Sequence, residues 1–283
     1  MTFFAFRGVK SHPTRCEKPI SKEDKVLTRP KSVFLGLFLL FFTVFIASCV
    51  STPEKKSVGI QEADLHLRIG INYLVKGNIE MADFELSKAE RLNPRNPEVH
   101  FALGTVDIAK KEYAEAIVQF NRTVAIDKDY ADAYNNMGFA YLKLGQWDKA
   151  IQSCNKALKS IGYQTPEKAL TIIGKAYYRK GDKGRAIEYL QRALAIDPKE
   201  PQSANTMARI YLEDGNVDKA KRILSGVIEN HPNYANARLN MGIALYKEQD
   251  FRAAKKEFNK VLELVDKKSA EGQLARGYLD LIK

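Results

Sequence analysis

The first residues to test for catalysis are a serine and a lysine three positions apart. Ser153 and Lys156 satisfy the pattern S-x-x-K, in which a lysine activates a serine nucleophile in β-lactamase-type folds. That chemistry needs a sheet beside the motif, whereas the surrounding sequence has helical spacing. Cys154, inside the motif, occupies an apolar position of that helical pattern. We therefore expect these residues to pack within a helix pair, without a catalytic role.

The four histidines leave little material for a metal site. His66 and His100 stand at the same position of two successive helical segments, and no second ligand follows either at metal-binding spacing. We expect them to lie in the core or in a groove. The sequence also contains no glycine-rich phosphate loop, no HExxH pair and no serine elbow. It therefore predicts a protein that is not an enzyme, with no catalytic residue, metal, cofactor or small-molecule substrate, whose function depends on its surface.

One cysteine has a context that predicts covalent modification. Residues 33–48 carry no charge, but sixteen residues are short of the roughly 20 that a membrane-spanning helix needs, and they suit the apolar region of an export signal. Residues 46–49, I-A-S-C, resemble the lipobox of bacterial lipoproteins. The resemblance implies that residues 1–48 are a signal peptide and that Cys49 carries acyl chains, palmitate among them, which anchor the protein without spanning the membrane.

The alternative is an uncleaved single-pass anchor that happens to end in a cysteine. In lipoproteins of this type an aspartate after the cysteine directs retention in the inner membrane. Val50 and Ser51 follow here, which favours the periplasmic face of the outer membrane. Residues 1–32 are long and acidic for the start of a signal peptide, so we hypothesise that translation begins later, at Val26 or Leu27.

A small residue recurs along the chain with a period of 34 and a single two-residue insertion. Its members are Gly70, Gly104, Gly138, Gly174, Ala208 and Gly242. An alanine stands twelve residues after each member, and a mostly bulky apolar residue stands sixteen after. A small residue on one helix and an alanine on the next allow two antiparallel helices to approach closely. The pattern predicts six helix pairs that share one core.

These residues resemble the tetratricopeptide repeat, over residues 63–268. The resemblance implies an all-α fold, a right-handed superhelical solenoid of six tetratricopeptide repeats with a concave face. Residues 269–283 have helical apolar spacing and are expected to form a C-terminal capping helix. Residues 49–62 are polar and are expected to form a lipidated tether, a flexible coil of roughly 20 Å.

A partner-binding groove is expected on the concave side of the solenoid. Counting from residues 63, 97, 131, 167, 201 and 235, first-helix positions 2, 5, 9 and 12 lie on that side in this repeat. The predicted groove residues are Leu67, Ile71, Leu74, Phe101, Thr105, Ile108, Phe139 and Leu142 in an apolar half, and Lys175, Tyr178 and Arg209 in a polar, basic half. Contiguous apolar surface favours binding of an amphipathic helix or an extended peptide. The alternative is that tight curvature makes these side chains ordinary core.

The net charge of +11 is unevenly distributed. Residues 1–48 hold eight of the 45 basic and three of the 34 acidic residues, so residues 49–283 keep +6, with both signs interspersed. The hydrophobic content of 45% and charged content of 28% are those of a folded protein. Export and the lack of a base-reading module argue against a nucleic-acid partner. The membrane is expected to be contacted through the lipid anchor.

Architecture, repeat number and two local stretches, residues 67–74 and 163–167, resemble the pilotins of type IV pilus systems, the PilF, PilW and Tgl group. The resemblance implies a lipid-anchored envelope scaffold that assists outer-membrane assembly of the pilus secretin, with a secretin subunit as the protein partner in the groove. Two other scaffolds stay open. One is an adaptor for peptidoglycan hydrolases and proteases similar to NlpI, and the other is a component of polysaccharide export machinery.

Overall fold

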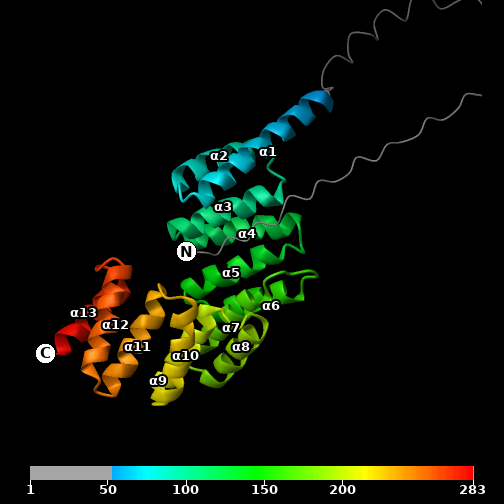
Figure 1. Cartoon of the computed structure of the whole chain (residues 1–283). Coiled ribbons are helices and arrows are strands. Elements are labelled where there is room, and N and C mark those ends of the chain that lie inside the picture. The colour runs from blue at the N-terminus through cyan, green and yellow to red at the C-terminus, as the bar shows by residue number, and fades with distance from the viewer. Residues whose placement is uncertain (1–52, 283) are drawn as a thin grey trace, which may run out of the picture. The chain divides into compact units, whose positions relative to one another are not determined.

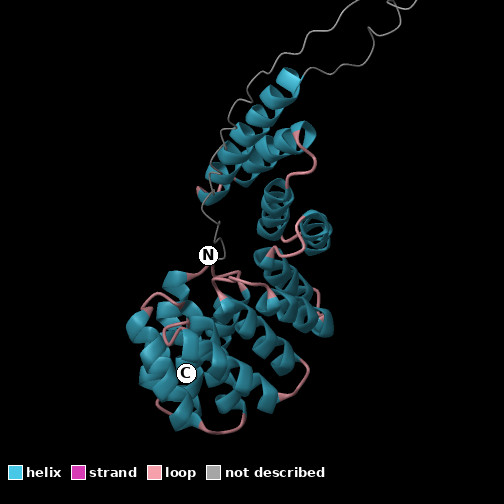
Figure 2. Ribbon diagram, turned by 90° about the vertical axis from the view of Figure 1, so that its right-hand side faces the viewer, coloured by secondary structure: helices cyan, strands magenta, loops and turns pink. Residues whose placement is uncertain are grey.

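The computed structural model describes residues 53–282, and every regular element in that range is an α-helix (Figures 1 and 2). The thirteen helices of this described range are α1 (Pro53–Val75), α2 (Ile79–Leu92), α3 (Pro97–Lys110), α4 (Tyr113–Ile126), α5 (Ala131–Lys143), α6 (Trp147–Lys159), α7 (Pro166–Arg179), α8 (Lys183–Ile196), α9 (Pro201–Glu213), α10 (Val217–Asn230), α11 (Ala235–Lys247), α12 (Phe251–Leu264) and α13 (Ala270–Leu281). The predicted signal peptide and Cys49 lie outside the described residues.

The described residues fall into two units, residues 53–62 and residues 63–282. The described part of the first unit, residues 53–62, is the beginning of α1. These residues are therefore helical, where the sequence predicted a flexible tether. The second unit holds the six helix pairs and α13, and together they form a superhelical solenoid of tetratricopeptide repeats.

The recurring glycines lie where the two helices of a pair touch. A Cβ built on each would come within 3.0 Å of the side chain sixteen residues later. The contacts are Gly70 with Leu86, Gly104 with Phe120, Gly138 with Cys154, Gly174 with Leu190, and Gly242 with Phe258. All five of those partner side chains are completely buried. The prediction that small residues permit close helix approach is confirmed.

The turn inside each helix pair needs a residue in the left-handed region of backbone conformation. At the fifteenth residue of four units a glycine meets this need, for example Gly77 with φ +78° and Gly181 with φ +84°. Units two and six place Lys111 and Gln249 there, with φ of +66° and +65°. A residue with a Cβ is strained in this region, typically by about 1–2 kcal/mol. The backbone conformation of these two turns is therefore less favourable than that of the four turns with glycine.

The helix pairs stack in sequence, and each second helix packs against the first helix of the following pair. One buried cluster joins units three and four, and another runs from unit four to unit six. The last helix, α13, packs on α11 and α12. Its Tyr278 ring stacks on Phe258 at 5.0 Å and meets Tyr246 edge-on at 5.1 Å. It thereby covers the core of the sixth pair, while Leu274 and Leu281 of the same helix remain exposed.

Candidate functional site

The S-x-x-K motif lies in α6 and belongs to the packing between helices. Cys154 is completely buried against Gly138, and Ser153 is buried beside it. Burial raises the pKa of the Cys154 thiol, which keeps it protonated. The Lys156 ammonium instead lies over the Tyr134 ring, 5.4 Å from its centre. These contacts leave no activated nucleophile at the motif.

The two histidines share a structural role that sequence reasoning missed. Nδ1 of His66 lies 2.5 Å from Glu85 Oε2, and this hydrogen bond lowers the pKa of Glu85. Nδ1 of His100 lies 3.0 Å from Gln119 Oε1, and its Nε2 donates to the Pro94 carbonyl at 2.8 Å. Each pair is separated by nineteen residues, so position 4 ties the first helix to the second. Within residues 53–282 no group of three or more His, Cys, Asp or Glu could hold a metal ion.

Arg238 occupies the same position in the sixth unit and makes the same two contacts. Its guanidinium donates to Glu257, again nineteen residues on, at 2.9 Å, and to the Pro232 carbonyl at 2.6 Å. In all three units the two partners are separated by nineteen residues. The sequence did not reveal this pairing because the partners are of different residue types: histidine or arginine on the first helix, and glutamate or glutamine on the second.

Four residues of the predicted apolar groove are core residues. Leu67, Leu74, Phe101 and Thr105 are each at most 5% exposed. The Phe101 ring lies 5.0 Å from the Tyr130 ring and 5.8 Å from the Phe120 ring, both in unit two. At these positions the alternative applies, since curvature packs the side chains against neighbouring helices. They cannot contact a ligand without opening the stack.

The other four apolar groove residues are partly exposed: Ile71, Ile108, Phe139 and Leu142. The Phe139 ring meets the Tyr113 ring edge-on at 6.3 Å, and the Lys143 ammonium lies 5.3 Å from its centre. We name these four residues the apolar stripe. It is smaller than the sequence predicted.

The basic half of the groove is held together by side-chain contacts across units. Arg209 Nε donates to the Tyr178 hydroxyl at 2.9 Å, and the Tyr178 hydroxyl donates to Glu213. Lys175 Nζ donates to Gln202 in the next unit. Lys175, Tyr178 and Arg209 are all only partly exposed.

The positive charges of this region are partly compensated, since Arg209 Nε lies 3.9 Å from Glu213 Oε1 and Glu200 stabilises the charged form of Lys175. Burial is the main cause that lowers the pKa of Lys175 to about 8. Glu200 opposes this shift, and Lys143 and Arg209 contribute to it. We name Lys143, Lys175, Tyr178 and Arg209 the basic cluster. Three members were predicted. Lys143 was missed because it stands at position 13, outside the set of concave positions considered.

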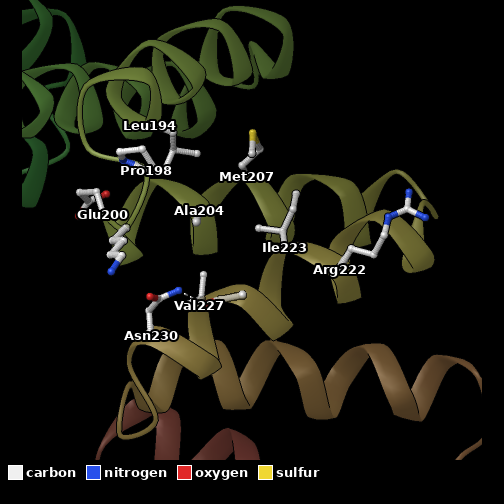
Figure 3. A pocket seen from close by; sticks show the side chains of 11 residues that line it. Leu194, Pro198, Glu200, Ala204, Met207, Arg222, Ile223, Val227 and Asn230 are labelled. Carbon is white, nitrogen blue, oxygen red and sulfur yellow. Dashed lines mark hydrogen bonds between the residues drawn. The ribbon is translucent and has the colours of Figure 1, made fainter.

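A cavity of about 320 Å³ lies on another face of the solenoid, between α8 and α10 (Figure 3). Its walls and rim include Leu194, Pro198, Lys199, Glu200, Ala204, Met207, Arg222, Ile223, Gly226 and Val227. Helix α9 contributes Ala204 and Met207, which by helical spacing lie on the side opposite Asn205 and Arg209. The cavity, here named the α8–α10 pocket, is thus separate from the concave groove and was not predicted.

Family models described as tetratricopeptide repeat match residues 129–199, 177–236 and 235–264, and a further TPR repeat model matches residues 106–145. The matched segments together span more than half of the chain. None of the helices in the described part of the chain is long and apolar enough to cross a membrane.

Among proteins of similar sequence is the type IV pilus assembly protein PilF of Pseudomonas aeruginosa, 26% identical over 183 residues, which cover 63% of this chain and 72% of PilF. The cellulose synthase operon protein C of Pseudomonas fluorescens is 25% identical over 158 residues, which cover 54% of this chain but only 12% of that protein.

Solved structures show the same fold. The structure of P. aeruginosa PilF superposes with a TM-score of 0.64 at 21% identity. The superposition includes 79% of this chain and 99% of the PilF chain. The structure of PilW, described as a widely conserved type IV pilus biogenesis factor, gives a TM-score of 0.65 at 22% identity and covers 75% and 96%. With the repeat models, the glycine contacts and the helix pairs in agreement, the chain belongs to the tetratricopeptide-repeat family.

Proposed function

We propose that this protein is a lipid-anchored scaffold of the bacterial envelope that assists outer-membrane assembly of a type IV pilus secretin. The observation that carries the proposal is the sequence similarity to PilF, which extends over 72% of that protein. The anchor is the acylated Cys49, which follows an apolar export signal. A segment of the secretin subunit would bind in the concave groove.

The groove has the chemistry to hold an amphipathic segment with an acidic end. The apolar stripe offers partly exposed Ile71, Ile108 and Leu142 to its apolar side. In the basic cluster, burial disfavours the charged form of Lys175, so a partner carboxylate there would stabilise that charge through a charge-assisted hydrogen bond. The proposal therefore assigns the partner's apolar residues to units one to three and its carboxylates to units three to five.

Deletion of the gene tests the function directly. We expect loss of the heat- and detergent-resistant secretin multimer on a gel, accumulation of secretin monomer, and loss of twitching motility. Cys49→Ala should reproduce part of this defect and release the protein from the membrane fraction. Normal multimers and normal motility in the deletion strain would contradict the proposal.

Charge reversal in the basic cluster tests the groove. Arg209→Glu should weaken capture of the purified secretin at least tenfold, because it places a carboxylate where the partner's carboxylate binds. Lys256→Glu, an equal change of charge on an exposed residue of α12, is the matched control and should leave capture unchanged. Equal capture by both variants would exclude the basic cluster as the binding surface.

A role in polysaccharide export is the second candidate, because the chain is similar to part of a cellulose synthase operon protein. In that case deletion would remove the surface polysaccharide and leave the secretin multimers intact. The two outcomes are distinguishable in one strain, by a polysaccharide stain and a secretin gel.

A further inference from the structure

We propose that the α8–α10 pocket is a second docking site, which takes one bulky apolar side chain of a partner protein flanked by acidic residues. It lies on a different side of α9 from the basic cluster. The proposal does not depend on which protein occupies the concave groove.

At one position of the pocket lining, unit five lacks a side chain that the other units have. The residues at the twenty-sixth position of the units are Lys88, Arg122, Lys156, Arg192, Gly226 and Lys260. In unit two this side chain reaches across to the preceding unit, where Arg122 donates to Glu90 at 3.0 Å, whereas in units one, three, four and six its contacts lie within the same unit. Gly226 has nothing to extend over unit four, and it lines the pocket beside Leu194.

At a second position, unit five again has a smaller side chain than the other units. Position 4 holds His66, His100, Tyr134, Leu170, Ala204 and Arg238. In units two and six this side chain fills the space below the preceding loop and donates to a proline carbonyl, that of Pro94 or Pro232. Ala204 cannot do this, and both Ala204 and the corresponding Pro198 line the pocket. Two independent reductions in size therefore open one cavity.

The fold itself does not require glycine at position 226. A Cβ built there would meet nothing within 4 Å, and glycine inside a helix costs about 1 kcal/mol relative to alanine. The glycines of the helix-pair contacts differ in this respect, because their Cβ atoms would collide with a neighbour. Packing therefore does not account for Gly226, and its lack of a side chain leaves this part of the pocket wall open.

The lining selects the occupant. Leu194, Met207, Ile223 and Val227 form apolar walls, and about 320 Å³ is at the lower end of small-ligand pockets, enough for a leucine, methionine or phenylalanine side chain. A single apolar anchor in such a pocket is a common means of recognising a peptide.

The rim favours carboxylates on either side of that anchor. In residues 53–282 neither the Lys199 ammonium nor the Arg222 guanidinium makes an ion pair with a carboxylate. The one acid on the rim, Glu200, caps α9 and accepts from the backbone N–H groups of Gln202 and Ser203, so the helix terminus offsets its charge. Figure 3 shows Glu200 and Arg222 at opposite ends of the pocket.

The test uses the full chain in detergent micelles and a fluorescein-labelled peptide with one leucine between two aspartates, measured by anisotropy. We expect saturable binding to the unaltered chain. Gly226→Arg restores the side chain that other units carry and should weaken binding at least tenfold while the melting temperature stays equal or rises. Gly277→Arg, at an exposed helix glycine of α13 that also has open space, is the matched control and should bind normally.

Two further measurements separate the contribution of the leucine anchor to binding from that of the charged rim. A peptide with alanine in place of leucine should bind at least tenfold more weakly, and Arg222→Glu should weaken the leucine peptide at least fivefold even if Gly226→Arg does not fold. Unchanged binding by Gly226→Arg, or equal binding of the two peptides, would overturn the proposal. So would a photo-crosslink from a benzoylphenylalanine at Asn230 to residues 49–52, since the chain would then fill its own pocket.

Discussion

At the scale of single residues, Asp107 is the side chain that most clearly destabilises the native state. It stands in the last turn of α3 at the position where units one, three, four and five have tyrosine. Burial is the main cause that raises its pKa to about 6. Lys110 opposes this shift, and Glu112, Asp83 and Glu115 contribute to it. An ionised carboxylate near a helix C-terminus is unfavourable for the same electrostatic reason. The charged form of Asp107 therefore destabilises the native state.

Asp107→Asn should stabilise the protein at pH 7 by less than about 3 kcal/mol, the full value of a shift of about two pH units, because Asp107 is only half-buried and solvent screens its charge. The sign follows from the raised pKa. The native state holds its proton up to about pH 6, whereas the unfolded chain releases it near pH 4, so the native protein loses stability between these values. Thermal unfolding of both chains from pH 4 to pH 8 should show their melting temperatures diverging through this window. A constant difference would mean that Asp107 is not the titrating group.

The sequence could predict which residues belong to the repeat but not how they pair. It gave Lys175, Tyr178 and Arg209 as neighbours in the groove, and the structure brings Tyr178 and Arg209 into contact. It did not separate core from surface among Leu67, Leu74, Phe101 and Thr105. Their burial depends on how tightly successive units stack, and the repeat period contains no information on that distance.

At the scale of helices, the glycine contacts decide how closely each pair packs. Gly174→Ala should destabilise the protein by about 1–3 kcal/mol, because the new methyl group would lie 2.7 Å from Leu190 Cγ and 3.2 Å from a backbone oxygen of Ala186. Gly277→Ala should instead stabilise it by about 0.5–1 kcal/mol, because its methyl group meets nothing. Urea unfolding of the two variants measures both. Destabilisation by both would point to a general requirement for helix glycines.

The turns give an opposite prediction for glycine. Lys111→Gly places a residue without a Cβ at a φ of +66°, as in four of the other units, and should stabilise the protein by about 1 kcal/mol. The same change at Lys110, one residue earlier and inside α3, should destabilise it and serves as the control. A fall in melting temperature for Lys111→Gly would show that the lysine side chain contributes more than the strain costs.

The repeat predicted the helix pairs of the solenoid but contained no information on the residues that precede it. The period of 34 predicts the six pairs, and the prolines mark the ends of second helices. Residues 53–62 have no repeat partner and a polar composition, so they resembled a coil, yet they continue into α1.

At the scale of the whole molecule, stability should be local because each unit contacts mainly its neighbours. Tyr278→Ala removes the ring that stacks on Phe258 and should cost about 3 kcal/mol. Hydrogen exchange should then rise in α11 to α13 and stay unchanged in α3 to α6. A uniform rise along the chain would mean that the solenoid unfolds as a single cooperative unit.

The two positions that open the α8–α10 pocket, Ala204 and Gly226, are not the ones that close the helix pairs. In unit five the closing contact belongs to Ala208 and Leu224, both completely buried. The residues that would bind a ligand and the residues that hold the helix pair together therefore occupy different positions of the same repeat. During evolution, two substitutions could therefore create or remove a ligand pocket in one unit while the unit stays folded. Each repeat of a tandem array could change its binding properties separately from the others.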